Sequence, residues 1–381
     1  MSDSLKPNIF SQTINQTFAN LQINNAFILR TITIGIVIIL AITIFAFIYN
    51  KLSLRRKECN NMNKLYNDFP RLSSFNSNDP KYQLSLRDYY IKTAYNACSI
   101  GNFKNNFVDL CALKNVIRQG ARCLDFEVYS IDNEPVIATS SIDSYDVKET
   151  YNSIPFSAVL ETISNYAFSG GTCPNPNDPI LIHLRIQSQN SVIFNKMAEA
   201  FKNNLEHRVM GKSYSYENYG NNFSNIPLSQ LSGKVIIIVD KSNPLFEGTD
   251  LDEYVNIASN SIFMRALRFN DVKFTHDMNE IIDFNKKNMT IVLPDLNAED
   301  NNYSASLAMK YGCQMAALSF QNFDSNMEYY DLFFDEAGSA FVLKPSNLRF
   351  IPLTINNPNP PPEAYSYKPR EVSSDFYGFT I

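Results

Sequence analysis

The longest apolar stretch of the chain lies near its N-terminus. Residues 31–49 read TITIGIVIILAITIFAFIY and contain no charged side chain. In a helix, about 20 apolar residues span the hydrocarbon core of a bilayer. A secretory signal peptide usually has a shorter apolar region, a basic start and a small-residue cleavage site, and a buried core helix is the other alternative. The pattern predicts a short polar tail at residues 1–25 and one transmembrane helix at residues 26–50.

The charges on either side of this span predict its orientation. The basic segment KLSLRRK at residues 51–57 follows the span, whereas only Lys6 and Arg30 precede it. By the positive-inside rule, the part of the chain after the span faces the cytoplasm. Residues 51–80 are first basic and then polar, which is typical of a linker. The sequence therefore predicts a single-pass membrane protein whose lipid partner is the bilayer around this helix.

Beyond the linker, short β-branched runs alternate with amphipathic stretches. This order favours a parallel α/β fold, and about eight such units suit a (β/α)8 barrel of roughly 250 residues. A final segment at residues 351–381 contains NPNPPP and is typical of an extended strap or a disordered end. The predicted strands are residues 121–128, 135–138, 180–186, 235–239, 290–293, 314–320 and 340–343. The predicted helices are residues 110–119, 156–167, 192–203 and 279–285.

Charge and composition narrow the classes of function. A formal net charge of −5 argues against nucleic acid as the main partner. The six cysteines have no metal-type spacing, so we expect reduced, buried thiols in a cytosol-facing domain. Only three histidines occur, which limits histidine-based catalysis, and each is expected to be structural or solvated: His183, His207 and His276.

Several phrases of the sequence match one enzyme family. Residues 88–96 read DYYIKTAYN and residues 117–127 read IRQGARCLDFE. They resemble the phrases YFI-SSSHNTY and LRQGCRCVELD, which open the X half of eukaryotic-type phosphoinositide-specific phospholipases C. The segments YGCQMAALSFQ at 311–321 and AFVLKPSNLR at 340–349 resemble the Y half. The resemblance implies a distorted TIM barrel, with an X-like half at residues 81–241 and a Y-like half at residues 242–350.

The same resemblance implies a reaction whose central groups are missing here. The family uses a calcium ion to activate the inositol 2-hydroxyl, one histidine to stabilise the phosphorane and another to protonate the leaving group. The first histidine position is occupied by Tyr95 and the second by Thr139. Loss of one positioned acid or base typically costs about 10²–10⁴-fold in rate. We therefore expect a degenerate enzyme that has also lost its calcium cofactor.

The calcium ligands implied by the resemblance are only partly present. Asn96, Asp125 and Glu127 remain as weak remnants of the metal site, whereas Arg185 stands where a further carboxylate is expected. A guanidinium beside a divalent cation is strongly repelled at low dielectric. We hypothesise that Arg185 occupies the calcium space and pairs with Asp125 or Glu127. As plain charged residues, the two carboxylates could pair with Arg122 or Arg185.

The headgroup-binding positions also differ from the family. Ile238 and Asp240 fall where the family has two lysines, and Ile291 and Leu293 fall where it has an arginine and a tyrosine. These substitutions remove the cations that would hold phosphates on an inositol ring. No substrate-binding position is expected to be intact.

Three functions remain open at this point. The first is a catalytically inactive phospholipase C-like scaffold or interaction protein with protein partners. A virus particle with an internal membrane is one setting for it, with capsid proteins as partners and the chain as a membrane or minor capsid component. The second is a residual phosphoinositide phosphodiesterase, which would bind metal and depend on Asp125 or Glu127. The third is a non-catalytic lipid-headgroup binder, which would bind anionic vesicles without the anchor.

Overall fold

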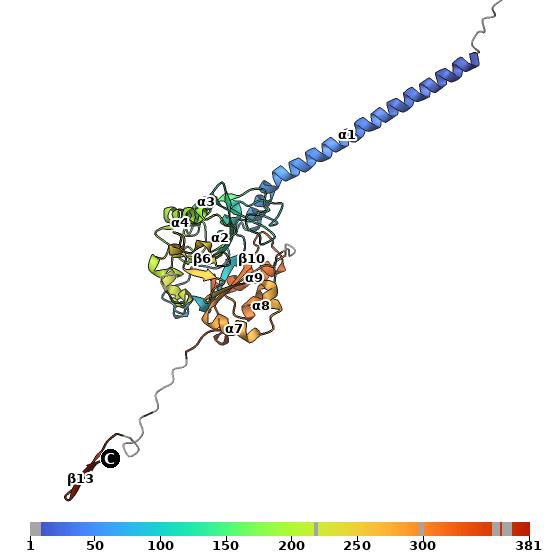
Figure 1. Cartoon of the computed structure of the whole chain (residues 1–381). Helices are drawn as coiled ribbons and strands as arrows, with labels where there is room; N and C mark the ends of the chain where they lie inside the picture. The colour runs from blue at the N-terminus through green and yellow to red at the C-terminus, as the bar shows by residue number, and fades with distance from the viewer. Residues whose placement is uncertain (1–8, 217–219, 297–300, 353–358, 360–367) are drawn as a thin grey trace, which may run out of the picture. The chain divides into compact units, whose positions relative to one another are not determined.

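The computed structural model describes residues 9–216, 220–296, 301–352, 359 and 368–381. The chain divides into two compact units, Met1–Arg349 and Phe350–Ile381. The first unit contains a long N-terminal helix and a barrel (Figure 1). The second contains one described β-hairpin, β12 (Glu371–Ser374) and β13 (Tyr377–Thr380), whose residues are almost all exposed.

Eight parallel strands form a nearly closed barrel, which confirms the predicted fold class. Hydrogen-bonded neighbours follow one another around the barrel, and the path begins at β7 and ends at β8. In spatial order the strands are β7 (Ile257–Ser259), β6 (Val235–Asp240), β5 (Ile180–Ile186), β2 (Cys123–Ile131), β1 (Tyr89–Ala94), β10 (Met315–Leu318), β9 (Met289–Leu293) and β8 (Met264–Arg268). Three further strands run antiparallel at its margins: β11 (Phe341–Leu343) on β1, β3 (Glu134–Ala138) on β2, and β4 (Ile154–Pro155) on β3.

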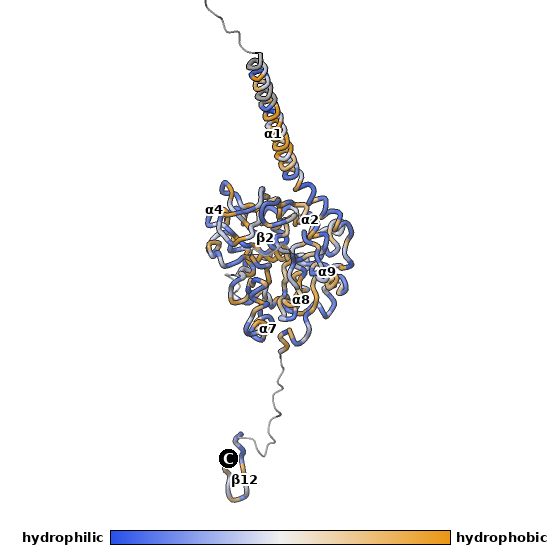
Figure 2. Tube along the Cα trace, turned by 90° about the vertical axis from the view of Figure 1, so that its right-hand side faces the viewer, coloured by the Kyte–Doolittle hydropathy of each residue, from blue (hydrophilic) through white to orange (hydrophobic). Residues whose placement is uncertain are grey.

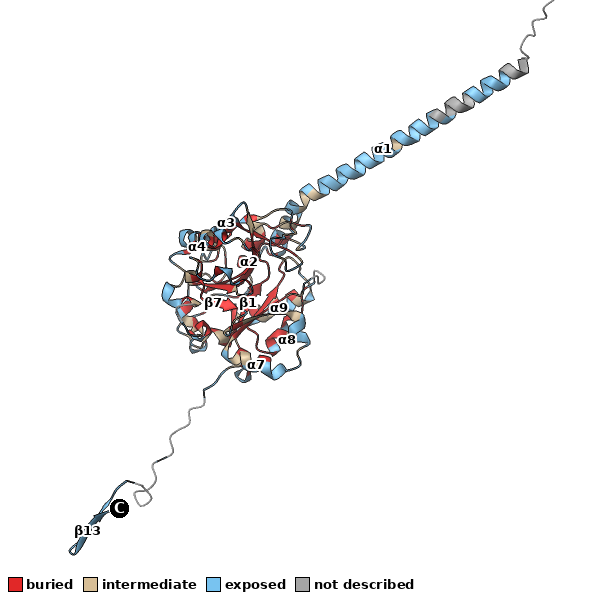
Figure 3. Cartoon of the chain, in the orientation of Figure 1, coloured by how far each residue is buried: buried red, intermediate tan, exposed pale blue. Residues whose placement is uncertain are grey.

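Alternation along the strands separates an outer core from an inner one. On β5, Ile182 and Leu184 face the surrounding helices, whereas Leu181 faces the barrel interior. All seven residues of β5 are buried, because one face is covered by helices and the other lies inside the barrel (Figure 3). The lower interior is filled by apolar side chains such as Ile236 and Met315, so the barrel is a packed core rather than a pore.

The predicted helices between the strands are confirmed, with ends that move by at most two residues. Each begins near the carboxyl end of a strand and returns along the outside of the barrel. The helices are α2 (Leu110–Arg118), α3 (Phe156–Tyr166), α4 (Val192–Leu205), α6 (Phe269–Lys273), α7 (Met278–Lys287), α8 (Ala305–Lys310) and α9 (Ser325–Ala337). The sequence pattern did not predict α6, α8 or α9, which are short or have a weakly segregated apolar face.

The N-terminal helix α1 (Ile9–Leu65) is much longer than predicted. The predicted tail from residue 9 onward and the first half of the predicted linker are helical, so these two boundaries were wrong. Between Pro7 and Pro70 the sequence has no proline and only one glycine, and nothing else there ends a helix. Within the described residues, α1 is the one helix long and apolar enough to cross a membrane (Figure 2). Its apolar segment is exposed (Figure 3).

The last turns of α1 pack on α2 instead of forming a free linker. Met62 is buried, and the Asn115 amide donates to Asn63 at 2.7 Å. A disulfide joins Cys59 on α1 to Cys111 on α2. The expectation of six reduced thiols was therefore wrong for these two, because a surface helix brings together cysteines that are 52 residues apart in sequence. The remaining cysteines are free and buried as expected: Cys98, Cys123, Cys173 and Cys313.

After α1 the chain descends along the barrel wall. The Tyr66 hydroxyl donates to the carbonyl of Phe320 at 2.6 Å, and the Phe75 amide donates to Asp178 at 3.0 Å, just before β5 begins. Residues 66–75 therefore run from one end of the barrel to the other. Of the predicted Pro-rich tail at 351–381, residues 353–358 and 360–367 lie outside the described residues, and the sequence pattern missed the hairpin that follows.

A pair of glycine substitutions tests how firmly this descending segment packs. Gly120 and Gly248 both have positive φ, at 74° and 73°, but an added Cβ lies 2.5 Å from Leu72 Cδ1 at Gly120 and meets nothing within 4 Å at Gly248. We expect Gly248→Ala to cost about 1 kcal/mol from backbone strain alone, and Gly120→Ala to cost about 1–3 kcal/mol more from overpacking. Denaturant unfolding of the detergent-solubilised chain measures both. Equal losses would mean that Leu72 is not packed against the barrel.

Candidate functional site

Polar side chains line the upper interior of the barrel, at the carboxyl ends of the parallel strands. We call this end the mouth. β2 and β5 are in register, with Asp125 opposite His183 and Glu127 opposite Arg185. Residues two apart on a strand face the same side, so all four side chains point into the barrel. Asn96 follows β1 in a left-handed conformation, with φ of 42°, and turns its amide toward the same point.

Arg185 is the centre of this group. Its Nε and Nη2 donate to the two oxygens of Asp125 at 3.0 and 2.8 Å, and its Nη1 donates to Oε1 of Glu127 at 2.8 Å. Nη2 also donates to Oδ1 of Asn96 at 3.1 Å. Of the pairings considered from sequence, the structure has Arg185 with both carboxylates. Arg122 lies at the opposite end of β2 and donates to Ala167 and Asn175.

The two carboxylates have their remaining acceptor positions filled by protein donors. Glu127 accepts from the Asn96 amide at 3.1 Å, from the Tyr129 hydroxyl at 2.8 Å and from the Ser140 backbone at 2.8 Å. Asp125 accepts from the Asn96 backbone at 3.2 Å and contacts Nδ1 of His183 at 2.7 Å. Every oxygen that points inward is therefore paired within the protein.

Burial and charge act against each other in this cluster, and charge prevails. Burial raises the pKa of Asp125, but Arg185 and His183 lower it more, so the pKa lies well below its usual value. Burial lowers the pKa of Arg185, but Asp125, Tyr95 and Glu127 raise it further above its usual value. Both groups are therefore ionised over the whole physiological range of pH.

A calcium ion, which the resemblance implies, does not fit these residues. Calcium takes six to eight oxygen ligands at about 2.3–2.6 Å. Both oxygens of Asp125, Oδ1 of Asn96 and Oε1 of Glu127 accept from the Arg185 guanidinium. Oε2 of Glu127 accepts from Tyr129 and Ser140 instead. A cation bound to these oxygens would lie against a fixed positive charge in a buried site, where screening by water is weak.

The two positions expected for catalytic histidines are also buried in protein contacts. The Tyr95 ring lies 4.8 Å from the Arg185 guanidinium carbon and packs edge-on against Phe103. Burial raises the pKa of Tyr95, so its hydroxyl stays protonated. The Thr139 hydroxyl donates to the carbonyl of Phe103 at 3.0 Å. Neither side chain supplies a group that could exchange a proton near neutral pH.

His183 is fully buried between two partners. Its Nδ1 lies 2.7 Å from Asp125 and its Nε2 lies 3.0 Å from the Ser259 hydroxyl at the end of β7. The three side chains have no measurable exposure and do not line the cavity described below. This arrangement fixes the orientation of Asp125, as the structural interpretation of His183 predicts. His207 and His276 are exposed on the surface, as expected for solvated residues.

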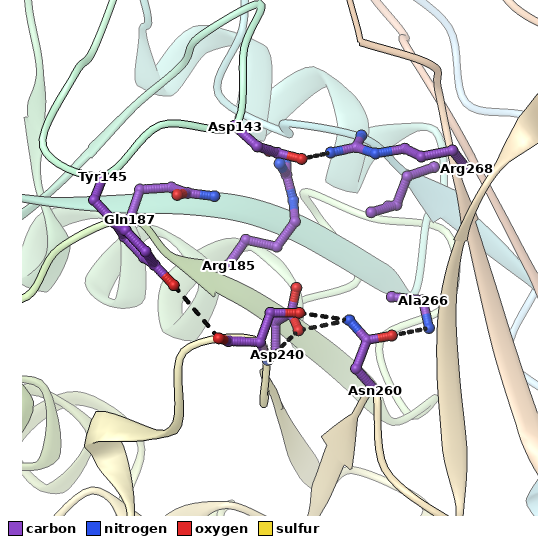
Figure 4. A pocket seen from close by; sticks show the side chains of 10 residues that line it. Asp143, Tyr145, Arg185, Gln187, Asp240, Asn260, Ala266 and Arg268 are labelled. Atoms are coloured by element: carbon purple, nitrogen blue, oxygen red, sulfur yellow. Dashed lines mark hydrogen bonds and ion pairs between the residues drawn. The ribbon is translucent and has the colours of Figure 1, made fainter.

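A cavity of about 330 Å³ lies above Arg185 at the mouth (Figure 4). Arg268, at the end of β8, forms an ion pair with Asp143 at 2.6 Å across it. Asp240 accepts from the Asn260 amide at 2.8 Å. The cavity is lined by Asp143, Tyr145, Arg185, Gln187, Asp240, Ser242, Asn260, Ala266, Arg268 and Leu293.

Residues 139–153, which we call the mouth loop, cross the barrel opening beside this cavity. Three contacts hold the loop to the ends of different strands. They are the ion pair of Asp143 with Arg268, a hydrogen bond from the Tyr145 hydroxyl to the Ser242 carbonyl at 3.4 Å, and one from the Asp146 amide to the Gln187 carbonyl at 2.9 Å. The loop therefore covers part of the mouth.

The four headgroup positions chosen from the sequence all lie on the inner face of the barrel. Ile238 and Ile291 are fully buried in the apolar interior, and Leu293 is nearly so. Asp240 reaches the cavity. The cations that do line the cavity, Arg185 and Arg268, are each paired with a carboxylate, so none of the described cavity residues offers an unpaired cation.

Arg268 was not identified from the sequence, and His183 was expected to be structural without being placed beside Asp125. His183 stands two residues before Arg185 on one strand, so strand alternation alone could have placed both in the barrel interior. Arg268 and Asp143 are 125 residues apart in sequence, and no local signal links them.

Comparisons with known proteins agree with this geometry. Residues 82–241 match the family described as "Phosphatidylinositol-specific phospholipase C, X domain", and residues 246–347 match the corresponding Y domain. The 1-phosphatidylinositol 4,5-bisphosphate phosphodiesterase delta-4 of Xenopus laevis is 36% identical over 86 residues, which are 22% of this chain and 11% of that protein.

Among solved structures, PLC21 of L. pealei superposes with a TM-score of 0.59 at 18% identity, over 71% of this chain and 38% of that one. PLC21 of S. officinalis gives a TM-score of 0.57 at the same identity. At this identity the two structures support the fold alone. The chain spans well under half the length of these relatives.

Removal of Arg185 tests how strongly the site depends on it. Arg185→Met leaves two buried carboxylates without a counterion, and we expect the free energy of unfolding to fall by about 3–5 kcal/mol. The matched control is Arg265→Met, which removes a surface ion pair with Glu280 and is expected to cost at most about 1 kcal/mol. Denaturant unfolding compares the two variants. Similar losses in both would show that the cluster around Arg185 contributes little to stability.

Proposed function

The chain belongs to the phosphatidylinositol-specific phospholipase C family, and from that premise we propose that it is a member without phosphodiesterase activity. In this proposal the barrel serves as a membrane-anchored scaffold that binds other proteins. The observation that carries the proposal is the bonding of Arg185 to Asp125, Glu127 and Asn96, which takes up the oxygens that a catalytic calcium ion would need.

The groups around Arg185 support the same conclusion. Activation of the inositol hydroxyl needs a Lewis acid or a strong base, and protonation of the leaving group needs an acid that titrates near neutral pH. Tyr95 and Thr139 stand in the two histidine positions and offer neither. His183 is the one histidine near the cluster, and its two ring nitrogens are already bonded to protein partners. In this proposal, calcium is no longer a cofactor.

The anchor is the second part of the proposal. We propose that the apolar segment of α1 crosses a bilayer, and that the basic residues after it keep the barrel on the cytoplasmic side. The cytosol is reducing, so the Cys59–Cys111 disulfide fits this side only after the barrel has left the cytosol, as it has in a virion. A virion with an internal membrane remains our preferred setting, with the barrel between membrane and capsid and capsid proteins as its partners. Protease protection of the barrel in sealed membranes distinguishes the two sides.

The ion pairs of Arg185 and Arg268 make two alternative functions less favourable, a residual phosphodiesterase and a lipid-headgroup binder. A residual phosphodiesterase would have to bind metal beside Arg185. A lipid-headgroup binder would have to recruit Arg268, the cation at the cavity that is not part of the Arg185 cluster, away from Asp143. Both therefore require an existing ion pair to break before the ligand binds.

The direct test is hydrolysis of phosphatidylinositol and its 4,5-bisphosphate in mixed vesicles by the full-length chain, with calcium and with a chelator. We expect no turnover under either condition, while an active eukaryotic phospholipase C serves as the positive control. Asp125→Asn is the matched control variant. Calcium-dependent turnover that disappears in Asp125→Asn would overturn the proposal, since it would show that the cluster supports catalysis with unusual residues.

A further inference from the structure

The cavity at the mouth has an excess of negative charge and one carboxylate oxygen without a protein donor. We propose that this cavity binds a protonated primary amine, either a free diamine or the lysine side chain of a protein partner. The inference goes beyond the proposed function, because the amine site does not depend on the loss of phosphodiesterase activity.

Carboxylates outnumber guanidinium groups around the cavity. The ion pair that crosses it contributes no net charge. Arg185 is bonded to two carboxylates, Asp125 and Glu127, so the cluster below the cavity keeps one formal negative charge. Asp240 adds a second negative charge. A concave site lined by charge of one sign attracts ligands of the opposite sign, so the cavity favours a cation over a phosphate.

Asp240, the last residue of β6, is the lining carboxylate with an oxygen left for a ligand. Its Oδ1 accepts from the Ser242 backbone at 2.9 Å and from the Asn260 amide at 2.8 Å. Among the residues that the structure describes, no donor reaches its Oδ2. Asn260 is itself held, since its oxygen accepts from the Ala266 backbone at 3.1 Å (Figure 4). The carboxylate is therefore fixed in place with one oxygen open.

A small recess beside Asp240 has the size of an ammonium group. Its volume is about 30 Å³, and five of its lining residues also line the larger cavity: Tyr145, Arg185, Gln187, Asp240 and Ser242. A space of this size holds one water-sized group. A primary ammonium group is compact and has three N–H donors. It can therefore enter the recess and donate to Asp240, while its alkyl chain occupies the cavity of about 330 Å³.

Tyr145 supplies a second feature that suits an amine. Its ring lines both the recess and the cavity, and its hydroxyl donates to the Ser242 carbonyl at 3.4 Å. The negative face of an aromatic ring attracts an ammonium group. Ala266 and Leu293 add apolar surface to the lining, which suits the alkyl chain of the amine. The cavity thus offers a carboxylate, an aromatic ring and an apolar wall to one ligand.

Other classes of ligand fit these groups less well. A divalent cation takes six or more oxygens, whereas Asp143 is already paired with Arg268 and Asp240 offers one open oxygen. A phosphate would need one of the two arginines, and both are paired. An ammonium group needs one carboxylate and neutral acceptors such as the Gln187 amide oxygen.

Calorimetric titration of the full-length chain, in a neutral detergent and an amine-free buffer, tests the site. The amine probes are 1,4-diaminobutane and the N-acetyl methylamide of lysine, and the matched neutral probe is 1,4-butanediol. We expect saturable binding of at least one amine and no binding of the diol. Tighter binding of the diamine would assign the site to free diamines, and tighter binding of the lysine derivative to a partner's side chain. Failure of both amines to bind would overturn the inference, as would binding of inositol 1,4,5-trisphosphate in their place.

Asp240→Asn separates the charge of the carboxylate from the shape of the cavity. Asparagine keeps an oxygen for the Ser242 and Asn260 donors, so we expect a similar melting temperature and about 10–100-fold weaker amine binding. The matched control is Asp250→Asn, which removes an exposed carboxylate outside the cavity and should leave amine binding unchanged. Equal losses in both variants would mean that amines respond only to overall charge, and the inference would fail.

Tyr145→Leu is a second variant, and it leaves every charge in place. The Tyr145 side chain is 41% exposed, so its replacement does not threaten folding. Loss of the ring should weaken amine binding about 2–5-fold. If Asp240→Asn does not fold, unchanged binding in Tyr145→Leu would overturn the inference.

These titrations and the hydrolysis assay fail independently of each other. Turnover of phosphatidylinositol by a chain that also binds amines would refute only the proposed loss of activity. Absence of both turnover and amine binding would refute only the amine site.

Discussion

The ion pairing of Arg185 inside the barrel is the interaction on which the rest of the site depends. Two carboxylates on β2 are buried where water cannot solvate them, and such charges are tolerated only with a counterion and full hydrogen bonding. In a metal-dependent site the counterion is the metal. Here a side chain on the neighbouring strand supplies it, with Asn96, Tyr129 and Ser140 filling the remaining positions. The barrel thereby keeps its polar interior without depending on a ligand.

Much of this arrangement could be predicted from the sequence. Side chains alternate along a strand, so Asp125 and Glu127 on β2 face the same side, and Arg185 on β5 faces them once the two strands are neighbours. The segments that resemble the enzyme family place Asn96 close to this group. The ion pairs of Arg185 with the carboxylates follow from these two observations. The barrel strands β2, β5, β6, β9 and β10 were found because their buried apolar runs are a strong local signal, whereas β1, β7 and β8 were missed. The pairing of Arg185 with both carboxylates at once was not predicted, since a sequence does not give side-chain rotamers.

What the sequence could not give arises from contacts between distant segments. The length of α1 was underestimated because the polar residues after the span resemble a linker until α2 is present to pack against them. Apolar and polar residues do not alternate regularly along the mouth loop. Its position depends on contacts with Arg268, Ser242 and Gln187, which lie at the ends of three other strands. The end of α1 and the position of the mouth loop depend on contacts in the assembled barrel. Local secondary-structure propensity therefore carries little information about them.

If a guanidinium has taken the place of a metal ion in this site, calcium should not stabilise the chain, and thermal unfolding with and without calcium tests this. Arg185→Glu would place a third carboxylate among Asn96, Asp125 and Glu127, an oxygen set that suits calcium. We expect calcium to leave the melting temperature of the wild-type chain unchanged and to raise that of Arg185→Glu. Calcium at 100 times its dissociation constant would add about 2.7 kcal/mol to the free energy of unfolding of this variant. Calcium stabilisation of the wild-type chain that is lost in Asp125→Asn would contradict this expectation.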